Sequence, residues 1–539
     1  MNVKKTYITL EETKYFPKTL IDYINGEPYL APFYEYKPVT ADFKKAIEDR
    51  GKAHLNRAVL VEVLKERYGK NAPDTSESTR KNIERLASGN CFTVTTGHQL
   101  CLFTGPLFFI YKIITTVNLT LELARQYPEY HFAPVYWMAS EDHDFAEINH
   151  TYIFGKKLIW NPTAPPEGPV GSLSCDSLKP VIDELFTLMG DSGKNSGLQE
   201  LLSEAYLNHA TLSEAVFYLV DRLFNRYGLI IIDADDSRLK KEFLPVIKNE
   251  LLNHTSSGLM EETNRKLKSA GIEPQVYHRE LNLFYMDENG RNRIEKTENG
   301  YIVVNTGKTF SKEEIISTAH SSPEKFSPNV VLRPLYQQII LPNVCYVGGP
   351  SEVAYWLQLK EIFNYYHVSY PVIAPRCSAM IIDKPASERM KKLHIKVKDL
   401  FSDTEEIIKD FVVRNSNADT GFEDEKDKLK LVYDAIVQKT KQTDPTLVSI
   451  PEAELQKQYN ALKGLETKLI RAQKQKLESS VNQLRKLKEK LFPEGQLQER
   501  HDNFIPFYLL YGRLFIDMLA DNLVPLSDKF IVLEEEGTQ

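Results

Sequence analysis

The stretch CFTVTTGHQLCLFTGPLFFIYKIITTVNLTLELARQYP, residues 91–128, decides the fold class. CFTVTT is rich in β-branched and aromatic residues and predicts a strand, TGHQLCLFTGP predicts a loop, and the apolar segment after it predicts a long helix. FAPVYWMAS, residues 132–140, predicts a second strand soon after that helix. A strand, a loop, a helix and a strand in this order begin a parallel α/β sheet.

Further strands are predicted at LIIIDAD (229–235), NVCYVGG (343–349) and YPVIAP (370–375). Their nearly continuous apolar character is typical of parallel strands that are covered on both faces. Insertions separate them: residues 161–227 are predicted to be mostly helical, and YHRELNLFYMDENGRNRIEK (277–296) predicts a hairpin with ENG at its turn.

From about Ala386 the sequence changes to long, highly charged helical segments. In EAELQKQYNALKGLETKLIRAQKQKLESSVNQLRKLKEKLF, leucine and valine recur mostly at spacings of three, four or seven, with a slip between Leu469 and Leu477. This pattern favours an antiparallel helical hairpin or a dimer stalk over a regular parallel zipper. DTGFEDEKD and LFPEGQ predict breaks between the helices.

The composition excludes several classes of protein. A formal net charge of −7 gives no electrostatic footprint for nucleic acid. The sequence has no stretch of about 18 uncharged apolar residues, so we expect no membrane span. The five cysteines include no CxxC pair, and we expect reduced, buried thiols in a cytoplasmic protein instead of a zinc ribbon or a disulfide framework.

Three segments should lie outside the carboxyl ends of the strands, where open parallel sheets bind ligands. The first is TGHQLCLFTGP. Its glycines allow close backbone approach, and His98 and Gln99 can hydrogen-bond a substrate. Its spacing matches neither a Walker loop nor GxGxxG, so a glycine-punctuated turn explains it equally well.

The second segment is SEDHDFAEINH, residues 140–150. Ser140 and the acids after it are typical of a helix start. On such a helix His143, Glu147 and His150 would share one face, although HExxH is absent. A polar substrate or acid/base site, a metal site, and a purely structural helix start are the three interpretations.

The third segment is YVGGPSEVAYWLQLKEIF, residues 346–363, in which paired glycines end a strand and Pro-Ser opens a helix. A nucleotide or a carboxylate could approach the glycine backbone. Arg333 precedes this strand and Arg376 follows the last strand. Either arginine could clamp a carboxylate or phosphate, and a surface salt bridge is the alternative for each.

Together these segments resemble the family of the bacillithiol biosynthesis cysteine-adding enzyme, a cysteine ligase. Order, spacing and total length agree over essentially the whole chain. The matching motifs are TGHQLCLFTGPL at 96–107 with Lys112, WMASEDHDFAEINH at 137–150, YVGGPSEVAYWLQLK at 346–360 and PVIAPR at 371–376.

This resemblance implies an α/β fold with a Rossmann-like parallel-sheet core. The core would be similar to class I aminoacyl-tRNA synthetases and other nucleotidyltransferases, with two connecting-peptide insertions and a C-terminal α-helical coiled coil that mediates dimerisation. The expected domains are a helical N-terminal lead-in over 1–90, the core over 91–160 and 228–385, insertions over 161–227 and 272–330, and the coiled coil over 386–525.

The implied reaction joins L-cysteine to the amine of glucosaminyl malate in the last step of bacillithiol biosynthesis. The places of the superfamily's HxGH and KMSKS signatures hold TGHQL and RCSAM here, so ATP is expected by analogy alone. We expect no metal, Mg²⁺ aside. The expected protein is a cytoplasmic homodimer without nucleic-acid or membrane partners.

Amide formation needs an activated carboxyl group and an amine that has lost a proton. We therefore assign catalysis to Glu141, Asp142, His143 and Asp144, with Asp144 or His143 as the base. Arg333 or Arg376 would hold the malyl carboxylates. The residues assigned to substrate are Gly97, His98, Gln99, Gly105, Lys112, Asn149, His150, Arg333, Gln337 and Arg376, and those assigned to nucleotide are Gly348, Gly349, Ser351 and Glu352.

Two alternatives come from other classes of protein. A metal-dependent hydrolase or deacetylase of an amino-sugar conjugate would use His143, His150 and the neighbouring acids. A non-catalytic coiled-coil scaffold with a degenerate nucleotidyltransferase core would explain the missing HxGH and KMSKS residues.

Overall fold

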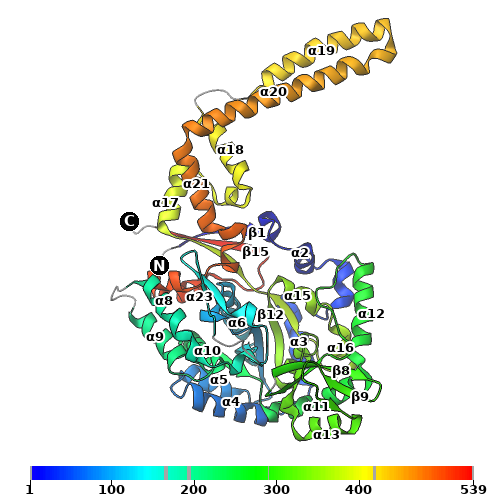
Figure 1. Ribbon diagram of the computed structural model, residues 1–539, viewed down its shortest axis with the longest axis vertical. Helices are drawn as coiled ribbons and strands as arrows, with labels where there is room; N and C mark the ends of the chain where they lie inside the picture. The colour runs from blue at the N-terminus through cyan, green and yellow to red at the C-terminus, as the bar shows by residue number, and fades with distance from the viewer. Residues whose placement is uncertain (1–2, 163–167, 191–195, 289, 417–420, 537–539) are drawn as a thin grey trace. The chain divides into compact units, whose positions relative to one another are not determined.

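The computed structural model describes residues 3–162, 168–190, 196–288, 290–416 and 421–536 (Figure 1). Within it the chain forms two compact units. The first contains Tyr7–Met380 and Gln496–Ile531, and the second contains Asn2–Thr6, Ile381–Gly495 and Val532–Gln539.

A five-stranded parallel sheet lies at the centre of the first unit, in the order β13-β12-β2-β3-β6. Its strands are β2 (Cys91–His98), β3 (His131–Met138), β6 (Ile230–Asp233), β12 (Asn343–Gly348) and β13 (Val372–Pro375). All five were predicted from their apolar runs, and the predicted parallel sheet is confirmed. Nearly every residue in them is buried, because helices cover the sheet.

Helix α6 (Phe108–Gln126) packs against β2 and β3, and α3 (Phe43–Gly51) packs against β12. Leu119 and Leu123 of α6 share one buried cluster with Phe43 of α3 and with residues of the strands. Burying each such side chain stabilises the fold by roughly 1.5–3 kcal/mol. The apolar run that predicted this helix is therefore the element that joins the first two strands to their covering layer.

The order of the strands creates a topological switch point beside β2. From β2 the chain proceeds through β3 to β6 on one side, and β12 and β13 then add on the other side of β2. Ligands of open parallel sheets bind at the carboxyl ends of the strands next to such a point. The loops after β2, β3, β6 and β12 are therefore the places where a site should form.

The loop between β2 and α6 has an unusual backbone. Phe103, Thr104 and Gly105 all have positive φ, at 50°, 71° and 68°. The side-chain amide of Asn503 donates to the Phe103 carbonyl at 2.8 Å and to the Gly105 carbonyl at 2.7 Å. A segment about 400 residues later in the chain thus holds this loop in place. Positive φ costs free energy at the non-glycine residues, and these hydrogen bonds offset that cost.

The N-terminal segment begins with a strand, β1, before its helices. This strand differs from the helical lead-in expected over 1–90. The elements are β1 (Val3–Thr9), α1 (Leu10–Thr13), α2 (Lys18–Asn25), α3 (Phe43–Gly51), α4 (Arg57–Asn71) and α5 (Glu77–Arg85). Strand β1 joins β15 (Lys529–Glu535) and β14 (Ser378–Ile382) in a small sheet of order β1-β15-β14, and a strand whose partners lie so far along the chain has no local signal.

Between β3 and β6 a short hairpin precedes a helical segment, as the sequence predicted for residues 161–227. The elements are α7 (Phe145–Ile148), β4 (His150–Ile153), β5 (Lys156–Ile159), α8 (Lys179–Met189), α9 (Ser196–Leu207) and α10 (Leu212–Phe224).

Between β6 and β12 lies a second, antiparallel sheet of order β10-β9-β8-β7-β11. The predicted hairpin is confirmed, with Phe284 of β7 opposite Arg293 of β8; Asn289 of its turn lies outside the described residues. The elements are α11 (Ser237–Asn253), α12 (Thr255–Ser269), β7 (Leu283–Asp287), β8 (Gly290–Thr297), β9 (Gly300–Val303), β10 (Thr309–Phe310), α13 (Lys312–Ser321), β11 (Phe326–Pro328) and α14 (Arg333–Ile340).

Four short helices complete the first unit: α15 (Pro350–Trp356), α16 (Lys360–Tyr365), α22 (Ile505–Tyr511) and α23 (Leu514–Asn522). No helix in the described ranges is both long and apolar enough to cross a membrane. All five cysteines are free and buried, as predicted.

The second unit is helical, with α17 (Lys384–Leu393), α18 (Thr404–Asn415), α19 (Glu423–Thr443), α20 (Ser449–Lys476) and α21 (Glu478–Leu491). Helices α19 and α20 lie side by side as an antiparallel pair, so the predicted helical hairpin is confirmed (Figure 1). The helix breaks at Leu477, where the leucine pattern slips. Val481 and Leu484 beyond the break are buried, whereas Leu465 and Leu469 before it are exposed.

Candidate active site

A cavity of about 940 Å³ opens at the carboxyl ends of the central strands, in the size range of ligand sites. Its wall includes Gly97–Gln99 at the end of β2, Met138–Asp142 at the end of β3 and Ala234–Asp235 after β6. Residues of the second sheet and of helices α14 and α15 complete it. The cavity lies where the topological switch point places it.

The three predicted motifs share this one cavity. The predicted site residues in its wall are Gly97, His98, Gln99, Lys112, Glu141, Asp142, His150, Arg333 and Glu352. Their chemical roles stay predictions. Most of the other predicted residues make structural contacts, and none of them is part of the wall: Gly105, His143, Asp144, Asn149, Gln337, Gly348, Gly349, Ser351 and Arg376.

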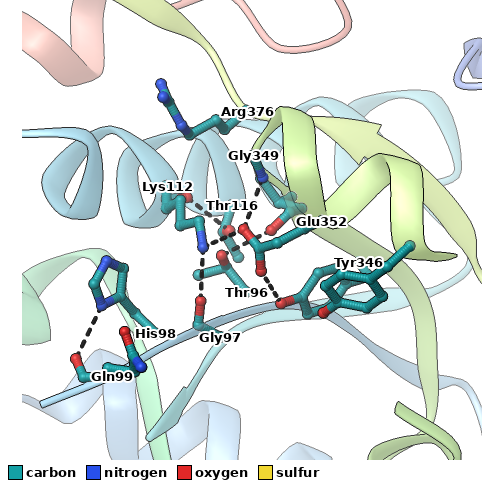
Figure 2. A network of polar contacts seen from close by, with 12 residues as sticks. Thr96, Gly97, His98, Gln99, Lys112, Thr116, Tyr346, Gly349, Glu352 and Arg376 are labelled. Atoms are coloured by element: carbon teal, nitrogen blue, oxygen red, sulfur yellow. Dashed lines mark hydrogen bonds and ion pairs between the residues drawn. The ribbon is translucent and has the colours of Figure 1, made fainter. Parts of the chain in front are cut away.

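Lys112 and Glu352 form an ion pair in the cavity wall (Figure 2). The Lys112 ammonium also donates to the Gly97 carbonyl at 2.9 Å, and Glu352 accepts from the Tyr346 hydroxyl at 2.5 Å and from the Gly349 N–H at 2.8 Å. Burial raises the pKa of Glu352, but Lys112 and these donors outweigh burial and hold the pKa below its usual value. Glu352 is therefore a charged group that organises the wall.

Gly348, Gly349, Ser351 and Glu352, which were assigned to a nucleotide, have contacts of their own. The Gly349 N–H already donates to Glu352, and the Gly348 carbonyl accepts from the Arg376 N–H at 2.9 Å. Ser351 is exposed away from the cavity. The Glu352 carboxylate argues against an anion on the Gly349 N–H, and the nucleotide assignment stays a prediction.

Arg376 and Gly105 are structural residues. The Arg376 guanidinium is buried in an ion pair with Glu499 at 2.8 Å and also donates to the Ser378 hydroxyl. Gly105 is required by its turn, because a Cβ there would lie 2.7 Å from the Cβ of Cys101. These contacts argue against the prediction that the two residues bind substrate.

Arg333 is the predicted arginine that faces the cavity. Its guanidinium lies 5.7 Å from the ring centres of Trp137 and Tyr346, and one amino group donates to Gln337 at 3.1 Å. Gln337 is buried behind the wall, so it positions Arg333 instead of binding substrate. Arg333 forms no ion pair with a carboxylate in the described part of the chain, which leaves its charge for an anionic ligand.

Three further arginines in the wall were missed by the sequence analysis: Arg279, Arg291 and Arg293. Arg291 is held by the Ser327 hydroxyl and the Pro328 carbonyl, both at 3.0 Å. Arg279 and Arg293 are exposed, and their side chains form no hydrogen bond or ion pair within the described ranges. The signal was present in R-N-R, because residues two apart on a strand point to the same face.

Acidic residues also line the wall. Glu141 pairs with the buried Lys240 at 2.5 Å and accepts from the Ser327 hydroxyl at 2.5 Å. Asp142 accepts from the Gln99 amide at 2.9 Å, and the same amide contacts Glu147. These acids are therefore fixed by specific donors, and Gln99 is a structural link between two of them.

The stretch SEDHDFAEINH is not a single helix. Helix α7 covers only Phe145–Ile148, and His150 begins strand β4. Ser140 caps nothing; its hydroxyl donates to Asp233 at 2.5 Å. His143, Glu147 and His150 therefore share no helix face, and the described residues contain no group of three or more histidine, cysteine or acidic side chains that could hold a metal ion.

The two residues predicted as the base, His143 and Asp144, lie outside the cavity wall. Asp144 is exposed and caps α7 by accepting the Glu147 N–H at 3.3 Å. His143 lies 2.9 Å from an amino group of Arg291, and burial and this arginine lower the pKa of His143. Asn149 contacts the ring of its neighbour His150 at 3.1 Å. Position argues against Asp144 as the base, and His143 is already engaged by a cation.

His98 and Cys101 line the cavity but are chemically quiet. Burial, with the nearby Lys112 charge, lowers the pKa of His98 to about 3, so this imidazole is neutral. Burial raises the pKa of the Cys101 thiol to about 12. A nucleophilic cysteine needs a depressed pKa, so Cys101 is not an activated nucleophile.

Asp235, which follows β6, was also missed. Its side chain is accessible from the cavity. Enclosure by the surrounding protein and then the Glu141 carboxylate raise the pKa of Asp235 to about 7, against the opposing charge of Lys240. LIIIDAD held the signal, because its last residues lie at the same edge of the sheet as the predicted motifs.

Comparisons with known proteins agree with this architecture. The chain matches the family model "Bacillithiol biosynthesis BshC, N-terminal Rossmann-like domain" over residues 1–377 and "Bacillithiol biosynthesis BshC, C-terminal coiled-coil domain" over residues 379–535.

Relatives named "Putative cysteine ligase BshC" match nearly the full chain. Those from Flavobacterium johnsoniae and Flavobacterium psychrophilum are each 41% identical, over 98% of this chain and 99% of their own length. One from Bacillus thuringiensis is 27% identical over 95% of this chain and 97% of its own. The chain therefore belongs to the BshC family of bacillithiol biosynthesis, with a Rossmann-like domain followed by a C-terminal coiled-coil domain.

Proposed function

We propose that this protein is a ligase that joins the carboxyl group of L-cysteine to the amine of glucosaminyl malate, in the last step of bacillithiol biosynthesis. Membership of the family and the names of the relatives support the reaction class. The observation that carries the choice of substrate is the distribution of charge in the cavity wall.

Basic and acidic side chains both line the wall, and they come largely from different elements. The arginines come from the second antiparallel sheet, the segment before it and α14, whereas Glu141, Asp142 and Asp235 follow β3 and β6. Glucosaminyl malate carries two carboxylates on its malyl group and an ammonium on its sugar. In the proposed binding mode the carboxylates point toward Arg333, Arg279 and Arg293, and the ammonium points toward the acids that follow β3 and β6.

Arg333 is the best placed residue for one malyl carboxylate. Its guanidinium is oriented by Gln337 and by two aromatic rings, and it forms no ion pair with a carboxylate among the described residues. Arg279 and Arg293 supply further charge. A preoriented guanidinium binds a carboxylate through two parallel hydrogen bonds, which gives direction as well as affinity.

Amide formation from a free carboxylate also needs an activating reagent, and we propose ATP in this role. The residues first assigned to the nucleotide are engaged with one another and with Arg376, so no step is assigned to them. The chain's own residues bind the sugar conjugate, orient its amine toward the cysteinyl carboxyl group and remove a proton from that amine.

We further propose that the protein acts in the cytoplasm as a homodimer formed through the coiled-coil unit. Helix α19 has no buried residue, and the hairpin of α19 and α20 exposes Leu431, Val432, Ile436, Leu465 and Leu469. Exposed apolar residues repeated along a helical hairpin are typical of a surface that pairs with another copy.

The test is reconstitution with purified components. The protein is incubated with glucosaminyl malate, L-cysteine and ATP, and bacillithiol is followed by mass spectrometry while each component is omitted in turn. Product that forms only when all three components are present supports the proposal. Product that forms without ATP would show that another reagent activates the carboxyl group. Hydrolysis of the sugar conjugate, or tight binding without any product, would refute the ligase and favour one of the two alternative classes.

A further inference from the structure

Asp235 occupies a fixed position at the edge of the central sheet. It follows β6 directly, and its N–H donates to the Asp233 carboxylate at 3.3 Å. Asp233 is held by the Ser140 hydroxyl, and the carbonyl of Ala234 accepts from the Tyr336 hydroxyl at 2.8 Å. The two residues before Asp235 are thus locked to neighbouring elements, and the Asp235 carboxylate is presented to the cavity from a rigid support.

Asp235 differs from the other acids of the cavity wall in having no partner. Glu141 pairs with Lys240, Glu352 pairs with Lys112, and Asp142 and Glu147 both contact the Gln99 amide. The Asp235 side chain forms no hydrogen bond or ion pair with any described residue. A carboxylate that is already paired is a poor proton acceptor, so the unpartnered one is the acid of this wall that is free to react.

The charges around Asp235 act on its pKa in both directions. Glu141 and Asp233 raise its pKa, and Lys240 and Arg67 lower it, after the larger effect of enclosure by the protein. On the other side, Asp235 borders a second opening lined by charged residues of both signs, namely Asp236, Lys241, Asp287, Glu324 and Lys325. A carboxyl group with a pKa of about 7 is partly ionised at neutral pH and can both take and release a proton.

We propose that Asp235 is the general base that takes the proton from the sugar ammonium of the substrate. This assignment rests on the ligase function proposed above and replaces Asp144 and His143 in that role. The Glu141–Lys240 pair next to it is then a positioning pair, since both of its groups are already engaged.

The step balances in protons and electrons. The N–H bond of the ammonium breaks, its electron pair stays on nitrogen, and the proton forms an O–H bond with the Asp235 carboxylate. The amine then attacks the carbonyl carbon of a cysteinyl acyl phosphate or acyl adenylate, the C–N bond forms, and the phosphate or nucleotide leaves with the C–O electron pair. The second nitrogen proton is lost to water, and Asp235 releases its own proton to solvent through the open cavity.

Asp235→Asn tests the assignment, because it keeps the shape of the side chain and removes the base. We expect kcat with saturating glucosaminyl malate, cysteine and ATP to fall by roughly 10²-fold or more. The rise of kcat with pH near 7 should disappear, and KM for glucosaminyl malate should change by less than about threefold. Any part of the pH dependence of kcat that comes from ionisation of the substrate's own amine should remain in the variant.

Asp236→Asn is the matched control, since Asp236 is the next residue and caps α11 through the Arg238 N–H at 2.9 Å outside the main cavity. Asparagine caps helices as well as aspartate does, so this variant should turn over at the wild-type rate. Asp235→Ala provides a second readout: added formate should restore part of its rate, and formate should leave Asp236→Asn unchanged.

The outcomes separate the two proposals. No bacillithiol from the wild-type chain overturns the ligase function, and the base assignment with it. Product from the wild type together with an unchanged kcat and pH profile in Asp235→Asn overturns the base assignment alone. A variant that changes only KM would make Asp235 a binding residue and would also overturn it. Should Asp235→Asn fold poorly, formate rescue of Asp235→Ala decides.

Discussion

The Lys112–Glu352 pair offers the sharpest test of how the cavity wall is held together. The Lys112 side chain is 6% exposed and that of Glu352 is 21% exposed, so both charges are largely shielded from solvent. Lys112→Met removes one charge and leaves the other buried. Breaking a buried pair in this way costs about 3–5 kcal/mol, because the remaining carboxylate keeps its desolvation penalty. We expect a loss of that size in the free energy of unfolding of the first unit.

Urea unfolding followed by tryptophan fluorescence measures this loss selectively. All three tryptophans, Trp137, Trp160 and Trp356, belong to the first unit, so the change in fluorescence reports the unfolding of that unit and not of the helical unit. Arg125→Met on the same helix is the control. Arg125 pairs with Glu122 at 3.2 Å on the exposed surface, and losing such a pair should cost less than about 1 kcal/mol.

The dependence on pH checks the cause of the effect. In the wild type the depressed pKa of Glu352 gives stability that is present above the unfolded pKa of 4.5 and is lost as the pH falls through the folded value. Without Lys112, burial dominates and raises the pKa of Glu352, so the variant is penalised at high pH and relieved as the carboxyl group takes a proton. The difference between the two proteins should be largest at pH 8 and shrink toward pH 4.

A second substitution completes the cycle. Lys112→Met combined with Glu352→Gln removes both charges, and the neutral amide can still accept from Tyr346 and Gly349. The double variant should therefore be more stable than Lys112→Met alone, with a coupling energy of roughly 1–3 kcal/mol. A single-variant loss below about 1 kcal/mol at pH 8, or a double variant no more stable than the single one, would refute the view that a buried charge pair organises this wall.

Three further outcomes are expected. Asp235→Asn should raise the melting temperature, and the rise should grow from pH 5 to pH 8, because the raised pKa of the wild-type carboxyl group means that its ionisation destabilises the folded protein. Asp236→Asn should lower the melting temperature. Its partner Arg238 depresses the pKa of Asp236 more than burial raises it, so the charged carboxylate stabilises the wild type. Arg333→Met should raise KM for glucosaminyl malate roughly 10–100-fold in the ligase assay, since a charge-assisted hydrogen bond contributes about 1.5–3 kcal/mol. Leu431→Glu, at a side chain that is 70% exposed on α19, should convert a dimer to a monomer in light scattering without changing the melting temperature.

Each of these has a matched control. Opposite signs for Asp235 and Asp236 are required, and equal shifts would contradict the assigned pKa directions. For Arg333, KM for cysteine should stay within about threefold; a parallel rise would place the arginine elsewhere in the reaction. For the hairpin, Leu510→Glu changes another exposed leucine in the first unit and should leave the oligomeric state unchanged. A dimer that survives Leu431→Glu would contradict pairing through this part of the hairpin.

The central sheet was predictable because the local sequence of each strand indicates a strand. Runs such as CFTVTT and LIIIDAD are apolar and β-branched, and the long helix between the first two strands shows at once that they are parallel. The break at Leu477 was visible as a slip in the leucine pattern. Strand β1 was not predictable, since its partner in the sheet is β15, more than 500 residues away.

The site was predictable in location and less so in detail. The carboxyl ends of parallel strands meet at one edge, so the motifs after β2 and β3 had to converge with Glu352. Which side chains are already paired cannot be read from spacing: Arg376 meets Glu499, and Asp144 turns back to cap its own helix. Asp235 and the arginines of β8 were overlooked because neither a single Asp after a strand nor an R-N-R sequence within one matches a known motif.

The hold of Asn503 on the loop of Phe103, Thr104 and Gly105 has a consequence for dissecting the chain. A fragment that stops at residue 377, where the family's Rossmann-like domain ends, contains every strand of the central sheet but lacks Asn503 and Glu499. The loop would lose the hydrogen bonds that hold it with Phe103 and Thr104 at positive φ, and Arg376 would lose its counterion. Sequence families and folding units thus divide this protein at different places, and an active fragment has to carry residues 496–531 as well as the Rossmann-like domain.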